Sequence, residues 1–324
     1  MKRTHPLFLS VADVAALVRQ QGLADTLAGL VHCLDDDFRR WPEFDKCPRV
    51  ASHSPTGVIE LMPIADARLH SFKFVNGHPG NVRLGLPTVM AFGALAEVNT
   101  GLPLLISELT LSTALRTAAT SLLAARVLAR PDSRLVGIVG TGEQARQQVR
   151  WLRRLWDGPL EFALWGRSPE RADDAVRDLG REGIKASRAE QLEHMCRSSD
   201  IVITTTASRA PIVQSDWIRP GSHITAVGAD APGKQELATA LVARADVIVA
   251  DLTSQCIDHG EIATAIAAGQ LAIGRVTELG NVLAGTSVGR TTPEQITIAD
   301  LTGLAVQDIA IARSVLATVM AEAC

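Results

Sequence analysis

Residues 135–145 read LVGIVGTGEQA, and this stretch decides the fold class. The apolar run Leu135–Val139 leads into Gly140-Thr141-Gly142 and then into residues that can start a helix. The pattern is the G-x-G-x-x-A form of the dinucleotide-binding fingerprint. The first glycine permits a tight turn, the second lets a pyrophosphate approach the backbone, and Ala145 lets the helix pack close to the sheet.

The fingerprint predicts a cofactor site at the start of that helix. Free N–H groups and the positive end of the helix dipole attract phosphates there. The alternative interpretation is a tight turn between two buried elements. The predicted cofactor-binding residues of this turn are Gly140, Thr141, Gly142, Glu143 and Gln144.

The next predicted strand, Glu161–Trp165, bears on which dinucleotide is bound. An NAD site usually ends this strand with Asp or Glu, which binds the ribose 2′-hydroxyl. This chain instead has Gly166-Arg167-Ser168. A guanidinium and a hydroxyl suit a 2′-phosphate. The sequence therefore indicates NAD(P) and favours NADP, through Arg167 and Ser168, unless Arg167 is merely a solvated loop residue.

Strands and helices alternate along the second half of the chain. This alternation predicts a Rossmann-type doubly wound parallel sheet, hence an α/β fold, over residues 129–302. Thr205 closes the third strand and is a further cofactor-binding candidate. The predicted strands are 135–139, 161–165, 201–205, 223–227 and 247–250, and the predicted helices include 169–179 and 190–197.

The first 128 residues mix helical and strand patterns, which predicts an α+β domain. A helix is expected over 11–34 and another over 112–129. Strands are expected over 50–63, 69–75 and 102–109. A C-terminal helix, 303–324, is expected to return to this first domain.

Composition excludes several classes of protein. The 324 residues are 47% hydrophobic and carry a net charge of −3, so nothing attracts nucleic acid or an anionic membrane. No apolar stretch is long enough to span a bilayer, and the N-terminus lacks a signal-peptide pattern. The five cysteines are scattered without metal-ligand spacing, which predicts reduced thiols, no metal site and a cytoplasmic location.

The first half of the chain contains several unusual strings. They are DDFRRW (36–41), FDK (44–46), RVASHS (49–54), GVIELMP (57–63), FKFVNGHP (72–79), TVMAFG (88–93) and ALRTAATS (114–121). Together they resemble the family that contains bacterial ornithine cyclodeaminase, mu-crystallin and an archaeal alanine dehydrogenase. The resemblance is densest from about residue 35 to residue 125, and it continues through the fingerprint to Asp230-Ala231-Pro232-Gly233-Lys234.

The resemblance implies a homodimer in which the first domain, residues 1–128, serves substrate binding and dimerisation. It also implies a reaction. The reaction that fits best is that of a lyase in proline biosynthesis, which converts L-ornithine to L-proline and ammonia. Hydride leaves Cα for the oxidised cofactor, the side-chain amine attacks the resulting imine, ammonia departs, and the hydride returns. Catalytic residues from both domains are expected to converge on the nicotinamide.

The resemblance also assigns substrate-binding residues in the first domain. Arg49, Lys73 and Arg116 match positions that bind the α-carboxylate, and Lys73 is expected to be catalytic as well. Glu60 matches the position that meets the δ-amino group of ornithine, and Thr88 matches a polar pocket position. For Arg49 and Lys73 the alternative is a charge that reaches solvent from a strand edge, and for Glu60 it is the exposed face of a strand.

Asp230 follows a predicted strand, at the edge where parallel sheets bind ligands. The resemblance makes it the catalytic proton relay and a substrate contact, whereas an Asx-turn or a helix N-cap is the structural alternative. Lys234 is expected to contact the cofactor or to pair with Asp230.

Two departures keep a second function open. Arg167 stands near the place where the cyclodeaminase carries Asp, and residues 301–308, LTGLAVQD, look more like the dehydrogenase and reductase branch. The alternatives are an NADPH-dependent reductase of cyclic imines such as Δ1-pyrroline-2-carboxylate or Δ1-piperideine-2-carboxylate, an amino-acid dehydrogenase, and a non-catalytic NADPH-binding protein.

Overall fold

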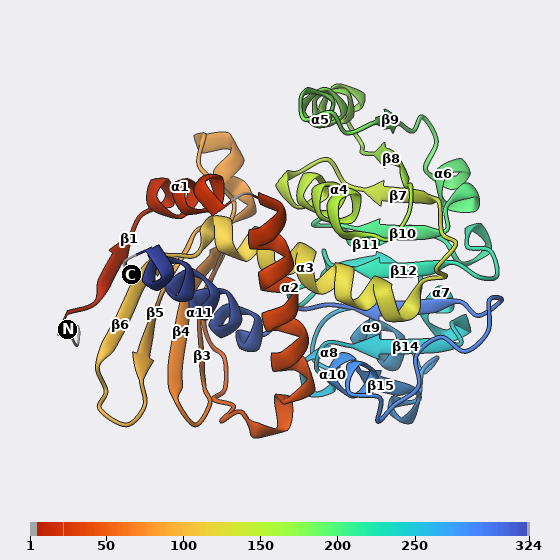
Figure 1. Cartoon of the computed structure of the whole chain (residues 1–324). Coiled ribbons are helices and arrows are strands. Elements are labelled where there is room, and N and C mark those ends of the chain that lie inside the picture. The colour runs from red at the N-terminus through yellow and green to blue at the C-terminus, as the bar shows by residue number, and fades with distance from the viewer. Residues whose placement is uncertain (1–4, 22, 323–324) are drawn as a thin grey trace. The chain divides into compact units, whose positions relative to one another are not determined.

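The computed structural model describes residues 5–21 and 23–322. The chain divides into two compact units (Figure 1). One, here the N-terminal unit, comprises the residues up to Thr117 and those from Leu304 onward. The other, here the Rossmann unit, comprises Ala118–Gly303. No helix among the described residues has both the length and the apolarity needed to cross a bilayer.

The Rossmann unit is built on an eight-stranded sheet in which every recorded pairing is parallel. The order is β15-β14-β16-β12-β10-β7-β8-β9 (Figure 1). The chain moves from β7 outward through β8 and β9, then resumes at β10 on the other side of β7. This reversal is the topological switch point where such sheets bind ligands. The predicted Rossmann-type α/β fold is confirmed.

The elements of this unit have the following bounds. The strands of the large sheet are β7 (Leu135–Val139), β8 (Glu161–Trp165), β9 (Ala186–Arg188), β10 (Ile201–Thr204), β12 (His223–Ala226), β14 (Val247–Ala250), β15 (Val276–Glu278) and β16 (Thr297–Asp300). A small sheet pairs β11 (Arg209–Val213) with β13 (Gln235–Leu237). The helices are α4 (Glu143–Leu155), α5 (Pro169–Arg181), α6 (Leu192–Ser198), α7 (Thr239–Arg244), α8 (Thr253–Cys256), α9 (Glu261–Ala267) and α10 (Leu279–Leu283), with short 3-10 turns at Ser215–Trp217 and Ile273–Arg275.

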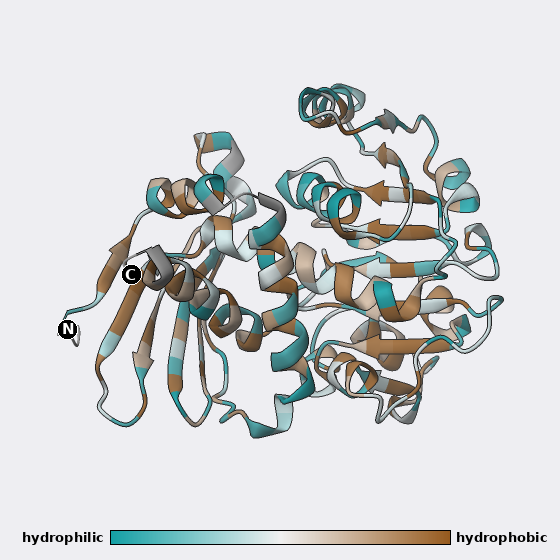
Figure 2. Ribbon diagram, viewed as in Figure 1, coloured by the Kyte–Doolittle hydropathy of each residue, from teal (hydrophilic) through white to brown (hydrophobic). Residues whose placement is uncertain are grey.

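Central strands of this sheet are buried along their whole length, as expected when helices cover both faces. Figure 2 shows them as mainly hydrophobic, whereas α5 is largely hydrophilic. The predicted strands 201–205 and 223–227 each end one residue earlier than expected. The sequence analysis missed β16, because two of its four residues, Thr297 and Asp300, are polar although buried.

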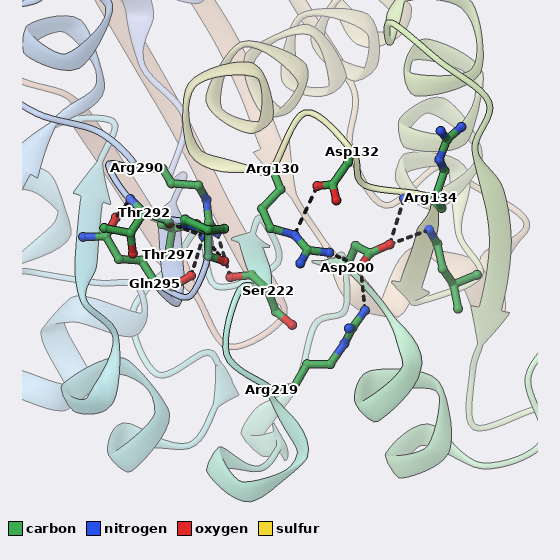
Figure 3. A network of polar contacts seen from close by, with 12 residues as sticks. Arg130, Asp132, Arg134, Asp200, Arg219, Ser222, Arg290, Thr292, Gln295 and Thr297 are labelled. Atoms are coloured by element: carbon green, nitrogen blue, oxygen red, sulfur yellow. Dashed lines mark hydrogen bonds and ion pairs between the residues drawn. The ribbon is translucent and has the colours of Figure 1, made fainter.

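A polar network closes the sheet edge at the amino ends of β7 and β10 (Figure 3). Asp200 accepts hydrogen bonds from the backbone N–H groups of Arg134 and Leu135, at 2.8 and 3.0 Å. It also accepts from the guanidinium groups of Arg130, at 2.8 Å, and Arg219. Burial alone would raise the pKa of Asp200, but these donors hold it below its usual value. The network stabilises the edge opposite the fingerprint turn.

The N-terminal unit contains a six-stranded sheet in the order β1-β6-β5-β4-β3-β2. Only β1 pairs in parallel, and the other pairings are antiparallel. The strands are β1 (Leu7–Leu9), β2 (Val50–Ser54), β3 (Gly57–Ala65), β4 (Leu69–Gly77), β5 (Ala91–Glu97) and β6 (Pro103–Glu108). The helices are α1 (Val11–Gln21), α2 (Leu23–Arg39) and α11 (Ala305–Glu322), with 3-10 turns at Trp41–Glu43 and Pro79–Leu84; α3 (Thr110–Leu128) begins in this unit and ends in the other.

Helix α11 packs against α2 and against the face formed by β3 and β4 (Figure 1). Arg313 of α11 donates to both oxygens of Asp37 on α2, each at 2.9 Å. Asp37 also accepts from Arg40 at 2.9 Å. This ion pair, in which the Asp37 carboxylate is fully buried and Arg313 is partly exposed, fixes α11 over the sheet.

Several expected elements of this unit differ from the structure. The predicted strand 50–63 is wrong as one strand: it is the hairpin β2–β3, which turns at Pro55-Thr56. The predicted helix 11–34 is two helices, with residue 22 outside the described residues. Strand β5 was not predicted, because its glycine and alanines have low strand propensity. The last residues of the predicted helix 303–324 also lie outside the described residues.

Candidate functional site

Strand register places Glu60 and Lys73 on one face of the N-terminal sheet. Met62 is directly opposite Lys73, and Glu60 is two residues before Met62. Because side chains alternate along a strand, all three point to the same side. That side is the buried one, covered by α11. Glu60 is therefore not on the exposed face of its strand.

Lys73 and Arg116 share one carboxylate. The Lys73 side chain is 1% exposed, and its Nζ donates to Oδ1 of Asp308 at 2.8 Å. Nε of Arg116, whose side chain is 8% exposed, lies 3.3 Å from the same oxygen. Arg116 also donates through Nη1 to the side-chain oxygen of Gln307. The first turn of α11 thus contributes two side chains to this cluster.

The surroundings of Lys73 make its proton easier to lose. Burial lowers the pKa of Lys73 most, and the neighbouring Arg116 lowers it further. Asp308 opposes both effects, and the resulting pKa is about 8. A lysine with this pKa can change protonation state near neutral pH.

Arg49 and Glu60 form a second ion pair on the same sheet. Nη1 of Arg49 lies 3.2 Å from Oε1 of Glu60, and the two side chains are 19% and 21% exposed. Thr88 lies between β4 and β5, where its carbonyl accepts from the His78 N–H at 2.9 Å. Among the described residues, no recorded hydrogen bond joins the Thr88 hydroxyl to these charged side chains.

In the Rossmann unit, the fingerprint turn leaves little room for side chains except at Gly142. Gly140 has φ +131°, and a Cβ there would lie 2.3 Å from Oγ1 of Thr205. A Cβ on Gly166 would lie 2.6 Å from Cγ2 of Thr141. At Gly142 a Cβ would meet nothing within 4 Å, so the space beside it is open.

The start of α4 fits the phosphates of a dinucleotide. Gly142 is its N-cap and supplies no capping side chain, so the first N–H groups of the helix point to open space. Nε2 of Gln144 is buried and has no hydrogen-bond partner in the described chain. A bound phosphate or ribose oxygen would satisfy both kinds of donor.

Arg146 supports this turn from behind, and the sequence analysis did not single it out. Its guanidinium donates to the carbonyl oxygens of Thr141 and Gly142, at 2.6 and 3.2 Å. It also pairs with Asp178 of α5 at 3.1 Å. A cation three residues after the start of α4 thus holds the glycine turn against the neighbouring helix.

The residues after β8 differ in how they are engaged. The Ser168 hydroxyl caps α5 by accepting from the Arg171 N–H at 3.3 Å, and it donates to Glu170 at 2.7 Å. The Arg167 side chain is exposed, and no interaction of it is recorded with another described residue. Arg167 is therefore available to a ligand, whereas Ser168 already has partners.

The loop after β12 carries Asp230 and Lys234, which form an ion pair. The side chains are 51% and 21% exposed. No helix begins at Asp230, which argues against the N-cap alternative. Its contact with Lys234 agrees with one of the two expected roles of that lysine.

Glu236 fixes the base of this loop and was missed in the sequence. It is fully buried and accepts hydrogen bonds from the Thr204 hydroxyl at 2.7 Å and the Gly228 N–H at 2.8 Å. It also accepts from the Thr206 N–H. Burial raises the pKa of Glu236. Its carboxyl group thus connects the end of β10 with the end of β12. The Gly228 N–H that it binds lies two residues before Asp230.

Comparison with known proteins agrees with this geometry. The model of the ornithine cyclodeaminase/mu-crystallin family matches residues 10–322. The chain belongs to this family. The family resemblance predicted from the sequence is thereby confirmed.

Relatives within the ornithine cyclodeaminase/mu-crystallin family carry several activities in their names. A protein of Agrobacterium fabrum named ornithine cyclodeaminase is 42% identical over 311 residues, which cover 95% of this chain and 86% of the relative. An archaeal alanine dehydrogenase dimer with bound NAD is 35% identical, with a TM-score of 0.91 over 98% of this chain and 97% of that one. Thermococcus litoralis Δ1-pyrroline-2-carboxylate reductase, solved with NADH and L-proline, is 27% identical, with a TM-score of 0.90 and 98% of each chain covered.

The arrangement in this family member offers two kinds of chemistry. Three cations and two acids, contributed by the N-terminal sheet and by helices α3 and α11, suit a ligand that carries both a carboxylate and an ammonium group. The glycine turn, the open start of α4 and the nearby loop suit a dinucleotide. Of the predicted substrate residues, Lys73 and Arg116 meet through Asp308, and Arg49 meets Glu60. No recorded side-chain contact joins Thr88 to them among the described residues.

Proposed function

We propose that this chain is a cyclodeaminase that converts L-ornithine to L-proline and ammonia with a bound nicotinamide cofactor. The observation that carries the proposal is Glu60 on the same buried sheet face as Lys73, which shares the Asp308 carboxylate with Arg116. A substrate with one carboxylate and no second amine has no use for that acid. The relative named ornithine cyclodeaminase, 42% identical, supports the same function.

The charged residues divide the substrate between them. Lys73 and Arg116 bind the α-carboxylate, since a guanidinium and an ammonium both donate charge-assisted hydrogen bonds. Arg49 joins them when the substrate enters. Its present partner Glu60, 3.2 Å away, then takes the δ-ammonium. Ornithine thus replaces one internal ion pair by two with itself, so no buried charge is left unpaired. Thr88 adds a polar wall to the pocket.

Residues of the Rossmann unit hold the cofactor. The pyrophosphate would be held by Gly140, Thr141, Gly142 and the first N–H groups of α4, and Glu143, Gln144 and Thr205 would complete the cofactor site. When bound, the nicotinamide supplies a hydride acceptor and donor. Asp230 takes a proton from the substrate amine and returns it to the departing ammonia. Lys234 pairs with Asp230 and contacts the cofactor.

Arg167 is proposed to bind the 2′-phosphate of NADP. Its side chain is exposed and has no recorded partner in the described chain, and no carboxylate ends β8. The 2′-phosphate is a dianion that a guanidinium binds through paired hydrogen bonds. The Ser168 hydroxyl contributes only if it leaves Glu170.

We propose that the chain acts as a homodimer through the outer face of its N-terminal sheet. Val50, Leu61, Phe74 and Phe92 form one row across four strands, in direct register. Leu61 and Phe92 are 42% and 48% exposed. Such a row is an apolar patch that a second copy can cover. Phe92→Asp should give a monomer in light scattering, whereas Val288→Asp, an exposed apolar residue of the other unit, should not. Self-association unchanged in Phe92→Asp would contradict this interface.

The proposed product places the chain in proline biosynthesis, and its scattered cysteines support a cytoplasmic location. The cysteines in the described part of the chain are all free thiols. Such thiols persist in a reducing compartment.

The function is tested with purified protein, L-ornithine and a catalytic amount of NAD⁺ or NADP⁺. Ammonia and proline should accumulate in equal amounts, with no net rise of absorbance at the reduced-cofactor wavelength. A second candidate, reduction of Δ1-pyrroline-2-carboxylate, is favoured by the exposed Arg167 and by the reductase relative. Stoichiometric NADPH consumption with that imine, and no ammonia from ornithine, would replace the lyase by the reductase.

A further inference from the structure

We propose that Asp308 is a positioning residue, whose carboxylate lets Lys73 and Arg116 stand side by side as one carboxylate-binding pair. The inference rests on the proposed function in one respect, namely that this pair binds the substrate carboxylate. Asp308 belongs to the segment 301–308, whose role was left open in the sequence.

Geometry gives Asp308 this role. A single oxygen, Oδ1, lies 2.8 Å from Nζ of Lys73 and 3.3 Å from Nε of Arg116. Lys73 comes from β4 and Arg116 from α3, so the acid on α11 holds together cations from two other elements. The second oxygen, Oδ2, is buried and has no hydrogen-bond partner among the described residues. The carboxylate is thus committed to the two cations.

Charge balance shows why the acid is needed. Two buried cations repel each other, and a lysine yields to such repulsion by losing its proton, whereas an arginine does not. Lys73 is faced by Arg116 from α3, by Arg49 ahead of β2, by Glu60 from β3 and by Asp308 from α11. Glu60 already pairs with Arg49, so Asp308 is the acid in direct contact with Lys73.

Removal of Asp308 should therefore neutralise Lys73. Its pKa is already about 8 with the acid in place, because burial and Arg116 lower it. Without the opposing carboxylate it should fall by about 1 to 3 pH units, the usual effect of one contacting charge. Only Arg116 would then remain charged beside the substrate carboxylate at pH 8.

The sequence makes a direct measurement practical. The chain has five lysines, Lys2, Lys46, Lys73, Lys185 and Lys234. Selective ¹³Cε-lysine labelling of the full chain gives few signals, and Lys73→Arg identifies the Lys73 signal by its loss. The Lys73 titration midpoint is then read in wild type and in Asp308→Asn, with no substrate present.

A matched control separates this effect from general damage to α11. Asp37 is as deeply buried and pairs with Arg313 of the same helix. Asp37→Asn should leave the Lys73 midpoint where it is. Asp308→Glu keeps the charge and should restore most of the wild-type midpoint. If Asp308→Asn proves unstable, Asp308→Glu is used instead, and its binding of L-proline shows that it is folded.

Kinetics supply the second readout. In Asp308→Asn, KM for L-ornithine should rise about tenfold or more at pH 8.5 and by a smaller factor at pH 6, where a larger fraction of Lys73 is charged in the variant. A merely structural role would raise KM equally at both pH values. A larger rise of KM at pH 8.5 than at pH 6, with the wild-type kcat at pH 6, supports the proposal.

The outcomes are distinct. An unchanged Lys73 midpoint in Asp308→Asn, or an equal fall in Asp37→Asn, overturns the inference. If the wild type fails to turn over ornithine while the Lys73 midpoint still falls in Asp308→Asn alone, the proposed function fails and the positioning role stands.

Discussion

At the scale of single residues, Glu60 decides between a lyase and a reductase. Glu60→Gln keeps the size of the side chain but removes the charge that the δ-ammonium requires. We expect kcat/KM for L-ornithine to fall about 100-fold, because a buried ammonium loses its counter-charge. Reduction of Δ1-pyrroline-2-carboxylate, which has no second ammonium, should change less than about threefold. Both rates are measured on the same preparation.

Glu97→Gln is the matched control for Glu60→Gln, because Glu97 ends β5 and Thr100 is the only recorded partner of its carboxylate among the described residues. It should leave both rates unchanged. Equal losses of ornithine turnover and imine reduction in Glu60→Gln would remove Glu60 from the amine-binding role.

Arg167 decides the cofactor at the same scale. Arg167→Asp places a carboxylate where an NAD site usually has one, and it would repel a 2′-phosphate. The ratio of kcat/KM with NADP⁺ to that with NAD⁺ should fall about 100-fold, which corresponds to about 3 kcal/mol. Arg153→Asp, on the exposed end of α4, makes the same change of charge and should not alter the ratio. An unaltered ratio in Arg167→Asp would refute the NADP assignment.

At the scale of elements, the β7–α4 turn separates stability from cofactor binding. A Cβ on Gly142 would meet open space, whereas one on Gly140 would collide with Thr205 at a backbone angle of φ +131°. Gly142→Val should therefore leave the free energy of unfolding within about 1 kcal/mol and weaken NAD(P) binding at least about tenfold. Gly140→Ala should lower the free energy of unfolding by about 1 to 3 kcal/mol. Urea unfolding and cofactor titration by fluorescence measure the two effects.

Equal losses of stability in the two glycine variants would contradict the open space beside Gly142. The pair serves as its own control, since the two positions are two residues apart but differ in backbone angle and in what a side chain meets.

The elements also show how far the sequence could predict this molecule. The fingerprint and the apolar strands β7, β8 and β14 were predictable, because their patterns are local. The hairpin β2–β3 and the polar strand β16 were not, since burial there is decided by neighbours distant in the chain. Asp308 and Glu236 went unassigned for the same reason: an acid in an apolar helix or a short strand gives no sign of which cation or N–H it will meet.

At the scale of the whole molecule, buried acids make stability depend on pH. Burial raises the pKa of Asp300 to about 8 and that of Glu261 to about 9. Each acid accepts backbone N–H groups, and no salt bridge to a cation is recorded for either in the described chain. Two protons that are held in the folded state are lost near pH 4 in the unfolded chain.

The sign of the pH dependence follows from these raised values. The stabilisation is complete below the unfolded pKa and is lost as pH rises through about 8 to 9, because the folded state then binds more protons than the unfolded one. Ionisation of Asp300 alone should lower the free energy of unfolding by about 1 kcal/mol between pH 7 and pH 9. The buried thiol of Cys196, whose pKa is raised to about 12, adds to the loss above about pH 8.5, and Lys73, with its lowered pKa, opposes it.

Asp300→Asn isolates the contribution of one acid from these overlapping titrations. The amide oxygen can still accept from the Ile262 N–H, 2.9 Å from the carboxylate in the native chain, but it cannot ionise. Urea midpoints measured from pH 7 to pH 9 should therefore fall less steeply in Asp300→Asn than in wild type. Asp200→Asn, whose wild-type carboxyl has a lowered pKa and is ionised throughout this range, should keep the wild-type slope while losing stability at every pH. Parallel curves for Asp300→Asn and wild type would mean that Asp300 is ionised in the folded chain at pH 7. Hydrogen-bond donors, and not protonation of the carboxyl group, would then offset the cost of burying its charge.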